Sequence, residues 1–266
     1  MMELEVSTEF SDGDGGGQDG LASQERDAPV QPQGWMQDLV HGVAQSREPQ
    51  RIFAHVAGAA KALGFTHCAY GLRHPLPLAQ PRFALLNTYD ASWRRRYEEA
   101  GYLAADPVVA HGAHSLEPVV WTDDLFRHAR PMWEEARAEG LVVGWSQSCF
   151  DAVGAGGMLS LARDREYLSP AELRAKEPAL RWLVNVAHVA LAASLARHAS
   201  PPLLLTEREE QVLRWTADGK TSPEIAQILE LSVNTVNYHF KGALTKLGAS
   251  TKAAAVALWM ARSPRS

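Results

Sequence analysis

Three helix-start signals near the C-terminal end constrain the fold of this chain more than any other feature. Thr206 and Thr221 each stand three residues before a glutamate, the pattern of a capping box, and Ser232 is placed to cap a third helix. Apolar residues follow each start at helical spacing, and an alanine-rich segment at 252–260 predicts a fourth helix. Four short helices, with a turn near Glu230 between the second and third, predict a helix-turn-helix domain.

The third predicted helix has an apolar side and a polar side. Val236, Phe240 and Leu247 recur at helical spacing and form the apolar side. The polar side carries Asn234, Thr235, Asn237, Tyr238 and Lys241. Amide and ammonium groups pair with base edges, and hydroxyls bind phosphate oxygens. The pattern favours a DNA-reading face, and the alternative is the solvated face of a small helical bundle.

Charge divides the chain into three parts. Residues 1–34 hold eight acidic residues against one arginine, with a run of three glycines and few apolar residues. Such a segment cannot offset the entropy of ordering, so we expect a disordered acidic tail. The whole chain carries a net charge of −5, which leaves +2 for the remainder, all of it within residues 203–266. This small positive balance is weak support for a nucleic-acid partner.

The middle of the chain alternates helix and strand signals. Apolar residues have helical spacing at 35–43 and 52–63, and the capping box that starts at Ser169 opens a long helix to about residue 198. Strand-like segments lie at 66–72, 83–89, 145–151 and 158–163. Helices beside such strands predict an α+β fold, with an α/β/α sandwich before the all-α four-helix domain. The predicted bounds are 35–198 for the sandwich, 199–204 for a linker and 205–266 for the helical domain.

Other classes of protein are disfavoured by residue types and their spacing. Cys68 and Cys149 stand far apart in apolar stretches, which fits a reducing compartment rather than a disulfide framework. No apolar run has the length of a membrane span, and the N-terminus lacks a signal-peptide pattern, so we expect a cytoplasmic protein without a membrane partner. His111 and His114 lack an accompanying acid, third ligand or nucleophile, so we expect neither a metal site nor an enzyme.

The C-terminal segment resembles the DNA-binding domain of LuxR-type regulators. The matching residues are 205–209, 212–213, 219–221, 224–226, 229, 231–232, 235–236, 239 and 246–247. Gly242 and Lys252 depart from the asparagine and arginine that this family usually has there. The resemblance implies that double-stranded DNA is bound by the polar side of the third helix together with Lys220, Thr221, Ser232 and Lys246.

An aromatic pattern upstream resembles a second domain. Aromatic residues recur at intervals of four or five from Tyr89 to Tyr102, and Asp106 and Trp121 follow them. This spacing is similar to the acyl-homoserine-lactone-binding domain of quorum-sensing receptors, over about residues 35 to 195. The two resemblances together imply a quorum-sensing transcription factor. The alternative is a LuxR-type regulator that binds DNA without a ligand.

The resemblance implies a role for each residue of the aromatic pattern. The Trp93 indole would donate to the lactone carbonyl, and the Asp106 carboxylate would accept the amide N–H. Tyr89 and Ser160 would hold the amide carbonyl. Other residues expected around the ligand are Tyr97, Trp121, Phe126, Trp133, Leu141 and Ser146. Considered without the resemblance, the aromatic residues are ordinary core and Asp106 is a helix N-cap.

Partners follow from the same resemblance. One helix-turn-helix covers one half-site, so we expect a homodimer on a palindromic operator, with RNA polymerase as a further partner. The signal would be an N-acyl-homoserine lactone, with no cofactor. The alanine-rich segment Ala253–Ala257 is one candidate dimer surface. The second is the side of the long helix with Leu173, Leu180, Leu183 and Val184, which could instead cover the sheet.

Overall fold

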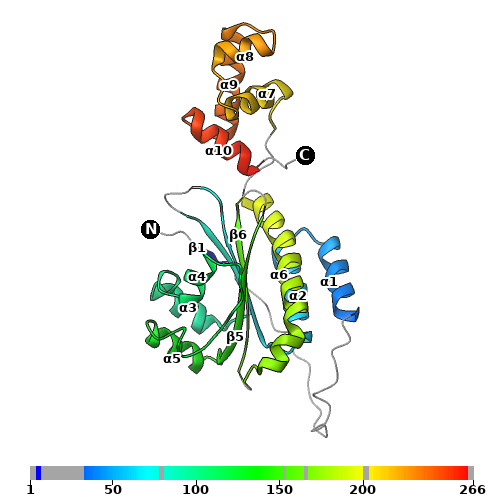
Figure 1. Ribbon diagram of the computed structural model, residues 1–266, viewed down its shortest axis with the longest axis vertical. Helices are drawn as coiled ribbons and strands as arrows, with labels where there is room; N and C mark the ends of the chain where they lie inside the picture. Colours follow the sequence, from blue (N-terminus) through cyan, green and yellow to red (C-terminus); the bar gives the residue numbers. More distant parts are fainter. Residues whose placement is uncertain are drawn as a thin grey trace.

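A six-stranded sheet forms the centre of the N-terminal domain in this computed structural model (Figure 1). In sheet order the strands are β1 (Leu4–Val6), β3 (Phe83–Asn87), β2 (His67–Arg73), β6 (Gly156–Arg163), β5 (Val143–Phe150) and β4 (Val119–Val120). β1 pairs parallel to β3, and all other neighbours are antiparallel. The structure describes residues 4–6, 33–77, 81–151, 154–164, 167–199 and 204–262.

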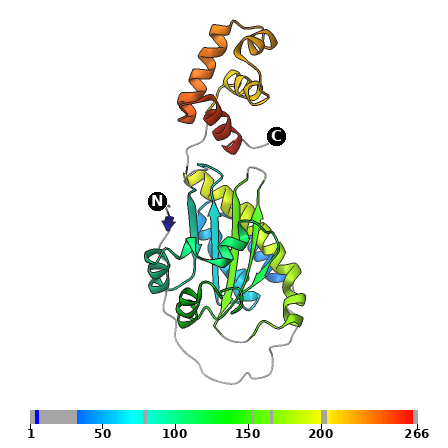
Figure 2. The same ribbon diagram turned by 60° about the vertical axis from the view of Figure 1, so that its left-hand side comes forward.

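Helices cover both faces of this sheet (Figures 1 and 2). On one face lie α2 (Pro49–Ala62) and α6 (Pro170–Ala199), with α1 (Gln33–Gln45) packed on α2. On the other face lie the short elements α3 (Ala91–Glu99), η1 (Tyr102–Ala104), α4 (Pro107–Gly112) and α5 (Arg130–Ala138). The three layers confirm the predicted α/β/α sandwich.

Side chains along β6 alternate between the two faces of the sheet, one of which is packed while the other lines a cavity. Leu159 and Leu161 are fully buried and belong to the core beneath α2 and α6. Met158 and Ser160 point to the opposite face, towards the short helices. The face with the long helices is therefore filled by packing, whereas the other face is free to line a cavity.

The long helix α6 is a core helix. Leu180, Leu183 and Val184 are at most 2% exposed and pack in the core of the sandwich, so of the two interpretations of this side of the helix, the one in which it covers the sheet is correct. In the sequence, an apolar stripe on a helix has the same pattern whether the helix packs on a sheet of its own domain or on the second subunit of a dimer. By length and hydropathy α6 would also suit a membrane span, but its contacts with β5 and β6 account for its apolar side.

Four helices form the C-terminal domain, as predicted. They are α7 (Glu207–Ala217), α8 (Ser222–Ile228), α9 (Val233–Leu247) and α10 (Lys252–Arg262). Thr206 closes a complete capping box on α7, and the Ser232 hydroxyl accepts a backbone N–H of α9 at 3.1 Å. Leu213, Val236 and Phe240 meet in the small core of this domain.

The predicted acidic tail and the predicted linker fall partly outside the described residues. Residues 7–32 of the acidic tail and 200–203 of the linker are among those the structure does not describe. Within the tail, however, β1 is a strand, which differs from the prediction of disorder throughout 1–34. The edge of β3 offers backbone groups that β1 pairs with, and a short strand of this kind has no composition signal of its own.

Candidate functional site

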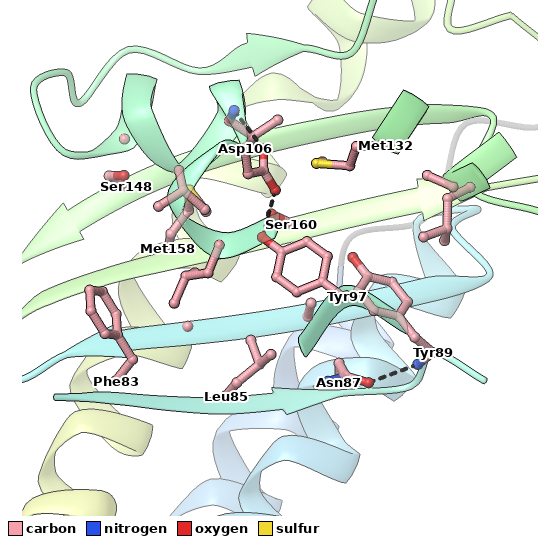
Figure 3. Close-up of a pocket in the computed structure, with 18 of the residues that line it drawn as sticks. Phe83, Leu85, Asn87, Tyr89, Tyr97, Asp106, Met132, Ser148, Met158 and Ser160 are labelled. Atoms are coloured by element: carbon pink, nitrogen blue, oxygen red, sulfur yellow. Dashed lines mark hydrogen bonds between the residues drawn. The ribbon is translucent and has the colours of Figure 1, made fainter. Parts of the chain in front are cut away.

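A cavity of about 310 Å³ lies between the sheet and the layer of short helices (Figure 3). Its floor consists of residues that alternate along the strands, such as Gly71 on β2, Leu85 on β3 and Ser160 on β6. Side chains from α3, α4 and α5 form the other walls. Most of the lining is apolar, with a few polar groups among it, which is typical of a small-molecule site.

Asp106 brings a carboxylate into this cavity at the start of α4. Its Oδ1 accepts the backbone N–H of Val108 at 2.8 Å, and its Oδ2 accepts the Tyr97 hydroxyl at 2.9 Å (Figure 3). Burial raises the pKa of Asp106, and the hydrogen bonds from Tyr97 and Val108 oppose that shift. Asp106 is thus a helix N-cap and also a cavity residue, so both of its proposed roles are compatible with the structure.

Two tyrosine side chains, Tyr89 and Tyr97, line the cavity beside Asp106. Burial raises the pKa of Tyr89, and burial together with the Asp106 charge raises that of Tyr97. Both phenols therefore stay protonated and can donate hydrogen bonds near neutral pH. The backbone N–H of Tyr89 donates to Asn87 Oδ1 at 3.1 Å, which fixes the chain where β3 ends (Figure 3).

A group of aromatic rings forms one wall. Phe126 and Trp133 are stacked, with centroids 4.4 Å apart, and Trp121 meets both rings edge-on at 6.2 and 6.3 Å. The Trp133 indole N–H donates to Asp123 Oδ1 at 2.7 Å. Trp93 stands beside Tyr97, with the ring centroids 5.9 Å apart. Each ring is held by at least one other, so the wall is preorganised.

The structure brings nine of the ten predicted ligand residues to the cavity wall. They are Tyr89, Trp93, Tyr97, Asp106, Trp121, Phe126, Trp133, Leu141 and Ser160. Ser146 differs: its side chain is fully buried and lies outside the cavity lining. It accepts a hydrogen bond from Trp121 Nε1 at 2.9 Å and donates one to Ser160 Oγ at 2.8 Å. Ser146 therefore supports the wall from behind.

Several lining residues were not predicted from the sequence. They include Ala69, Gly71, Phe83, Leu85, Val109, Gly112, Met132, Ser148 and Phe150. On β2 and β3 they recur at every second position, which is a detectable signal for one face of a strand. That signal does not tell whether the face meets a packed layer or a cavity.

Most of the predicted DNA-contacting side chains are exposed on the C-terminal domain. The exposed ones are Lys220, Thr221, Ser232, Asn234, Asn237, Tyr238, Lys241 and Lys246, and Thr235 is half-buried. A chain of hydrogen bonds orients Asn237: Lys252 Nζ donates to Ser222 Oγ at 3.2 Å, and Ser222 Oγ donates to Asn237 Oδ1 at 3.0 Å. The amide oxygen of Asn237 thus faces Ser222, and no hydrogen bond among the described residues uses its NH₂ group.

Lys246 and Gly242 are tied to the interior of this domain. Lys246 Nζ lies 2.7 Å from Oε2 of Glu209, a carboxylate that is only 6% exposed as a residue. Lys246 therefore pairs with this carboxylate while its side chain stays partly exposed, and its expected DNA contact remains a prediction. A Cβ atom at Gly242 would lie 2.6 Å from Glu209 Oε1, so glycine gives this carboxylate its space.

Neither histidine of the 111–114 pair belongs to a metal site in the described part of the chain. His111 Nε2 lies 2.9 Å from the carbonyl oxygen of Glu117, within hydrogen-bonding distance. Nowhere among the described residues do three His, Cys, Asp or Glu side chains gather as metal ligands.

Two family models match consecutive parts of the chain. Residues 48–191 match the autoinducer binding domain, and residues 203–259 match the bacterial regulatory proteins of the luxR family. The first match covers the sandwich from α2 into α6, together with the cavity residues, and the second covers α7 to α9 and most of α10. The family is one of transcriptional regulators and not of enzymes.

Similarity also extends over most of the length of known regulators. The transcriptional activator protein AnoR of Acinetobacter nosocomialis is 40% identical over 83% of this chain and 94% of its own length. The crystal structure of Escherichia coli SdiA matches with a TM-score of 0.73 at 32% identity, over 86% of this chain and 96% of that one. The N-acylhomoserine lactone dependent factor CepR2 of Burkholderia cenocepacia matches with a TM-score of 0.58 at 32% identity, over 62% and 97%. The chain therefore belongs to the LuxR family of quorum-sensing transcriptional regulators, with an autoinducer-binding domain before its DNA-binding domain.

Proposed function

We propose that this regulator binds an N-acyl-homoserine lactone in the cavity and, as a homodimer, binds a palindromic operator. The observation that carries the proposal is the Asp106 carboxylate, held by Tyr97 inside a largely apolar cavity. Each oxygen of this carboxylate already accepts one hydrogen bond and has room for a second, which an amide N–H of the ligand supplies.

The polar atoms of such a lactone match the polar groups around the cavity. The ligand has one amide N–H and two carbonyl oxygens on an otherwise apolar molecule. Asp106 accepts the N–H, Tyr89 and Ser160 donate to the amide carbonyl, and the Trp93 indole donates to the lactone carbonyl. An unmatched buried polar atom costs about 1–3 kcal/mol, so this complement favours an acylated amide over a plain fatty chain. The similarity to CepR2, named as N-acylhomoserine lactone dependent, supports the same ligand class.

Ligand retention tests this function. The full chain, expressed in a host that makes N-acyl-homoserine lactones, should carry one through purification, and mass spectrometry of the extracted small molecules should identify it. Protein from a non-producing host should unfold at a higher temperature once N-octanoyl-homoserine lactone is added, because a ligand that binds only the folded state stabilises it. A ligand-independent regulator would retain no lactone and show no shift in unfolding temperature.

The α9 face is proposed to read the major groove, with Lys220 and Thr221 on phosphates, and Ser232, Asn234, Thr235, Asn237, Tyr238 and Lys241 along the reading helix. Asn237→Ala should lower discrimination at one operator position by about fivefold, because one directed NH₂ donor is lost. Lys220→Ala, in contrast, should weaken binding to all sequences alike. Selection of sites from a random DNA pool separates the two effects. Unchanged discrimination in the Asn237 variant would remove it from the reading positions.

Dimerisation should accompany operator binding. A domain with a net charge of only +2 has little nonspecific attraction for DNA, so two half-sites are needed for affinity. On α10, Ala253 is exposed and Ala254 and Ala257 are half-buried, so this helix keeps a face of small residues. Sedimentation of the lactone-bound chain with and without operator DNA should show a dimer. A monomer in both conditions would contradict the proposed dimerisation. RNA polymerase in the cytoplasm would then be the further partner.

A further inference from the structure

Three side chains form a hydrogen-bonded chain that ends at the cavity. Trp121 Nε1 donates to Ser146 Oγ at 2.9 Å, and Ser146 Oγ donates to Ser160 Oγ at 2.8 Å. The sheet sets this geometry, because Ser146 of β5 and Ser160 of β6 are register partners, and the Trp121 backbone N–H bonds to the Gly144 carbonyl at 2.8 Å. Ser146 is fully buried, so solvent does not compete for its hydroxyl.

The hydrogen bonds run in one direction along the chain. An indole nitrogen donates and never accepts, so Ser146 must accept from Trp121. The hydroxyl of Ser146 in turn donates to Ser160 Oγ, which accepts. Ser160 is left with a hydroxyl hydrogen, and no hydrogen bond between the described residues uses that hydrogen. Ser160 lines the cavity beside Tyr97 and Asp106, where that hydrogen meets a ligand (Figure 3).

We propose that Ser146 is a positioning residue that makes Ser160 a hydrogen-bond donor towards the ligand. A free serine hydroxyl can donate or accept, and so would match either end of an amide. Because Ser160 already accepts from Ser146 and keeps its own hydrogen free, it favours a carbonyl oxygen of the ligand. Asp106, whose carboxylate oxygen accepts the Tyr97 hydroxyl, selects the N–H. Ser160 donates to the amide carbonyl and Asp106 accepts from the amide N–H. The amide therefore fits in one orientation only, which fixes where the acyl chain and the lactone ring lie.

This inference rests on the proposed lactone-binding function, and two variants of Ser146 test it in the full chain. Ser146→Ala removes the hydroxyl, and Ser146→Cys keeps the size with a much weaker hydrogen-bonding group. Calorimetric titration with N-octanoyl-homoserine lactone should show about three- to tenfold weaker binding for both variants. Ser160→Ala should weaken binding to a similar degree, and the Ser146→Ala/Ser160→Ala double variant should be no weaker than Ser160→Ala alone.

A spectroscopic measurement separates positioning from space filling. The lactone carries ¹³C at its amide carbonyl, and isotope-edited infrared spectra are recorded at saturating protein. Loss of the Ser160 hydrogen bond should move the labelled carbonyl band to higher frequency in Ser146→Ala and Ser146→Cys, as in Ser160→Ala. Additive losses of affinity, or a band that moves only in Ser160→Ala, would overturn the role of Ser146 and leave the proposed function intact. Failure of the unaltered chain to bind the lactone would overturn the proposed function, and this inference with it.

Discussion

Asp106→Asn should weaken binding of N-octanoyl-homoserine lactone by about 30- to 150-fold, equivalent to about 2–3 kcal/mol. The carboxylate offers the ligand N–H a charged acceptor, whereas the asparagine NH₂ group presents a donor to the same region. The substitution spares the fold, because asparagine also caps helices and its oxygen can still accept the Val108 N–H that Asp106 accepts now. Titration calorimetry measures the loss directly.

Asp90→Asn is the matched control for this variant. Asp90 also occupies a helix N-cap, at the start of α3, but its side chain makes no capping hydrogen bond and it is exposed. Lactone affinity should be unchanged in Asp90→Asn. If Asp106→Asn bound the lactone as tightly as the unaltered chain, Asp106 would be a helix cap only.

The pH dependence of the ligand-free protein provides a second readout of Asp106. Burial raises the pKa of Asp106 in the folded state, so the folded chain holds a proton on this carboxyl group more tightly than the unfolded chain does. The resulting stability is present below the unfolded pKa and is lost as the pH rises through the folded pKa. Asp106→Asn has no such proton, so its unfolding temperature relative to the unaltered chain should rise from acidic to neutral pH. A constant difference would contradict the shift.

Gly144→Ala should destabilise the protein by about 1–3 kcal/mol and lower lactone affinity at least tenfold. A methyl group at this position of β5 would overlap the Trp121 indole ring. Trp121 cannot move away freely, because Phe126 and Trp133 meet its ring edge-on. The displaced indole would lose its bond to Ser146 and narrow the cavity. Thermal unfolding and titration calorimetry measure the two effects.

Gly71→Ala is the control for this second variant. Gly71 is also a strand glycine in the cavity wall, but the nearest atom to a Cβ there is Leu85 Cδ1 at 3.9 Å, an ordinary contact. Its unfolding temperature should stay close to that of the unaltered chain. Equal behaviour of the two alanine variants would show that the Trp121 ring is not fixed in place.

Local signals explain which parts of the fold could be predicted from the sequence. The starts of α7 and α9 follow from side chains that bond within one helical turn, at Thr206 and Ser232, and these helices were predicted correctly. β4 and β1 were missed, because their short strands exist through pairing with distant segments. The stripe at Leu180 and Leu183 was visible, but the surface that it meets depends on the tertiary fold.

Local sequence signals are limited in the same way for the residues of the cavity and of the DNA-binding domain. The residues of the cavity wall were predicted through the resemblance of the aromatic pattern to a lactone-binding domain, whereas spacing alone only placed Trp93 and Tyr97 on one face of α3. The position of Ser146 behind the wall depends on its pairing with Ser160 across two strands. The ion pair of Lys246 depends on Glu209 from another helix. Single-residue chemistry cannot distinguish a group that faces a ligand from one that supports it.

The packing of Glu209 against Gly242 restricts how this DNA-binding domain can be changed. The carboxylate accepts the backbone N–H of Thr206 at 2.7 Å and the Lys246 ammonium at 2.7 Å, so it holds the start of α7 against α9. A larger residue at 242 would need a new position for that carboxylate, which ends a flexible side chain. The family usually combines a glutamate at 209 with an asparagine at 242, so the glutamate can take such a position. A helix transplanted here from a relative would therefore also move Glu209, and the packing of α7 on α9 should be compared before a change in DNA preference is assigned to the exposed residues of α9 alone.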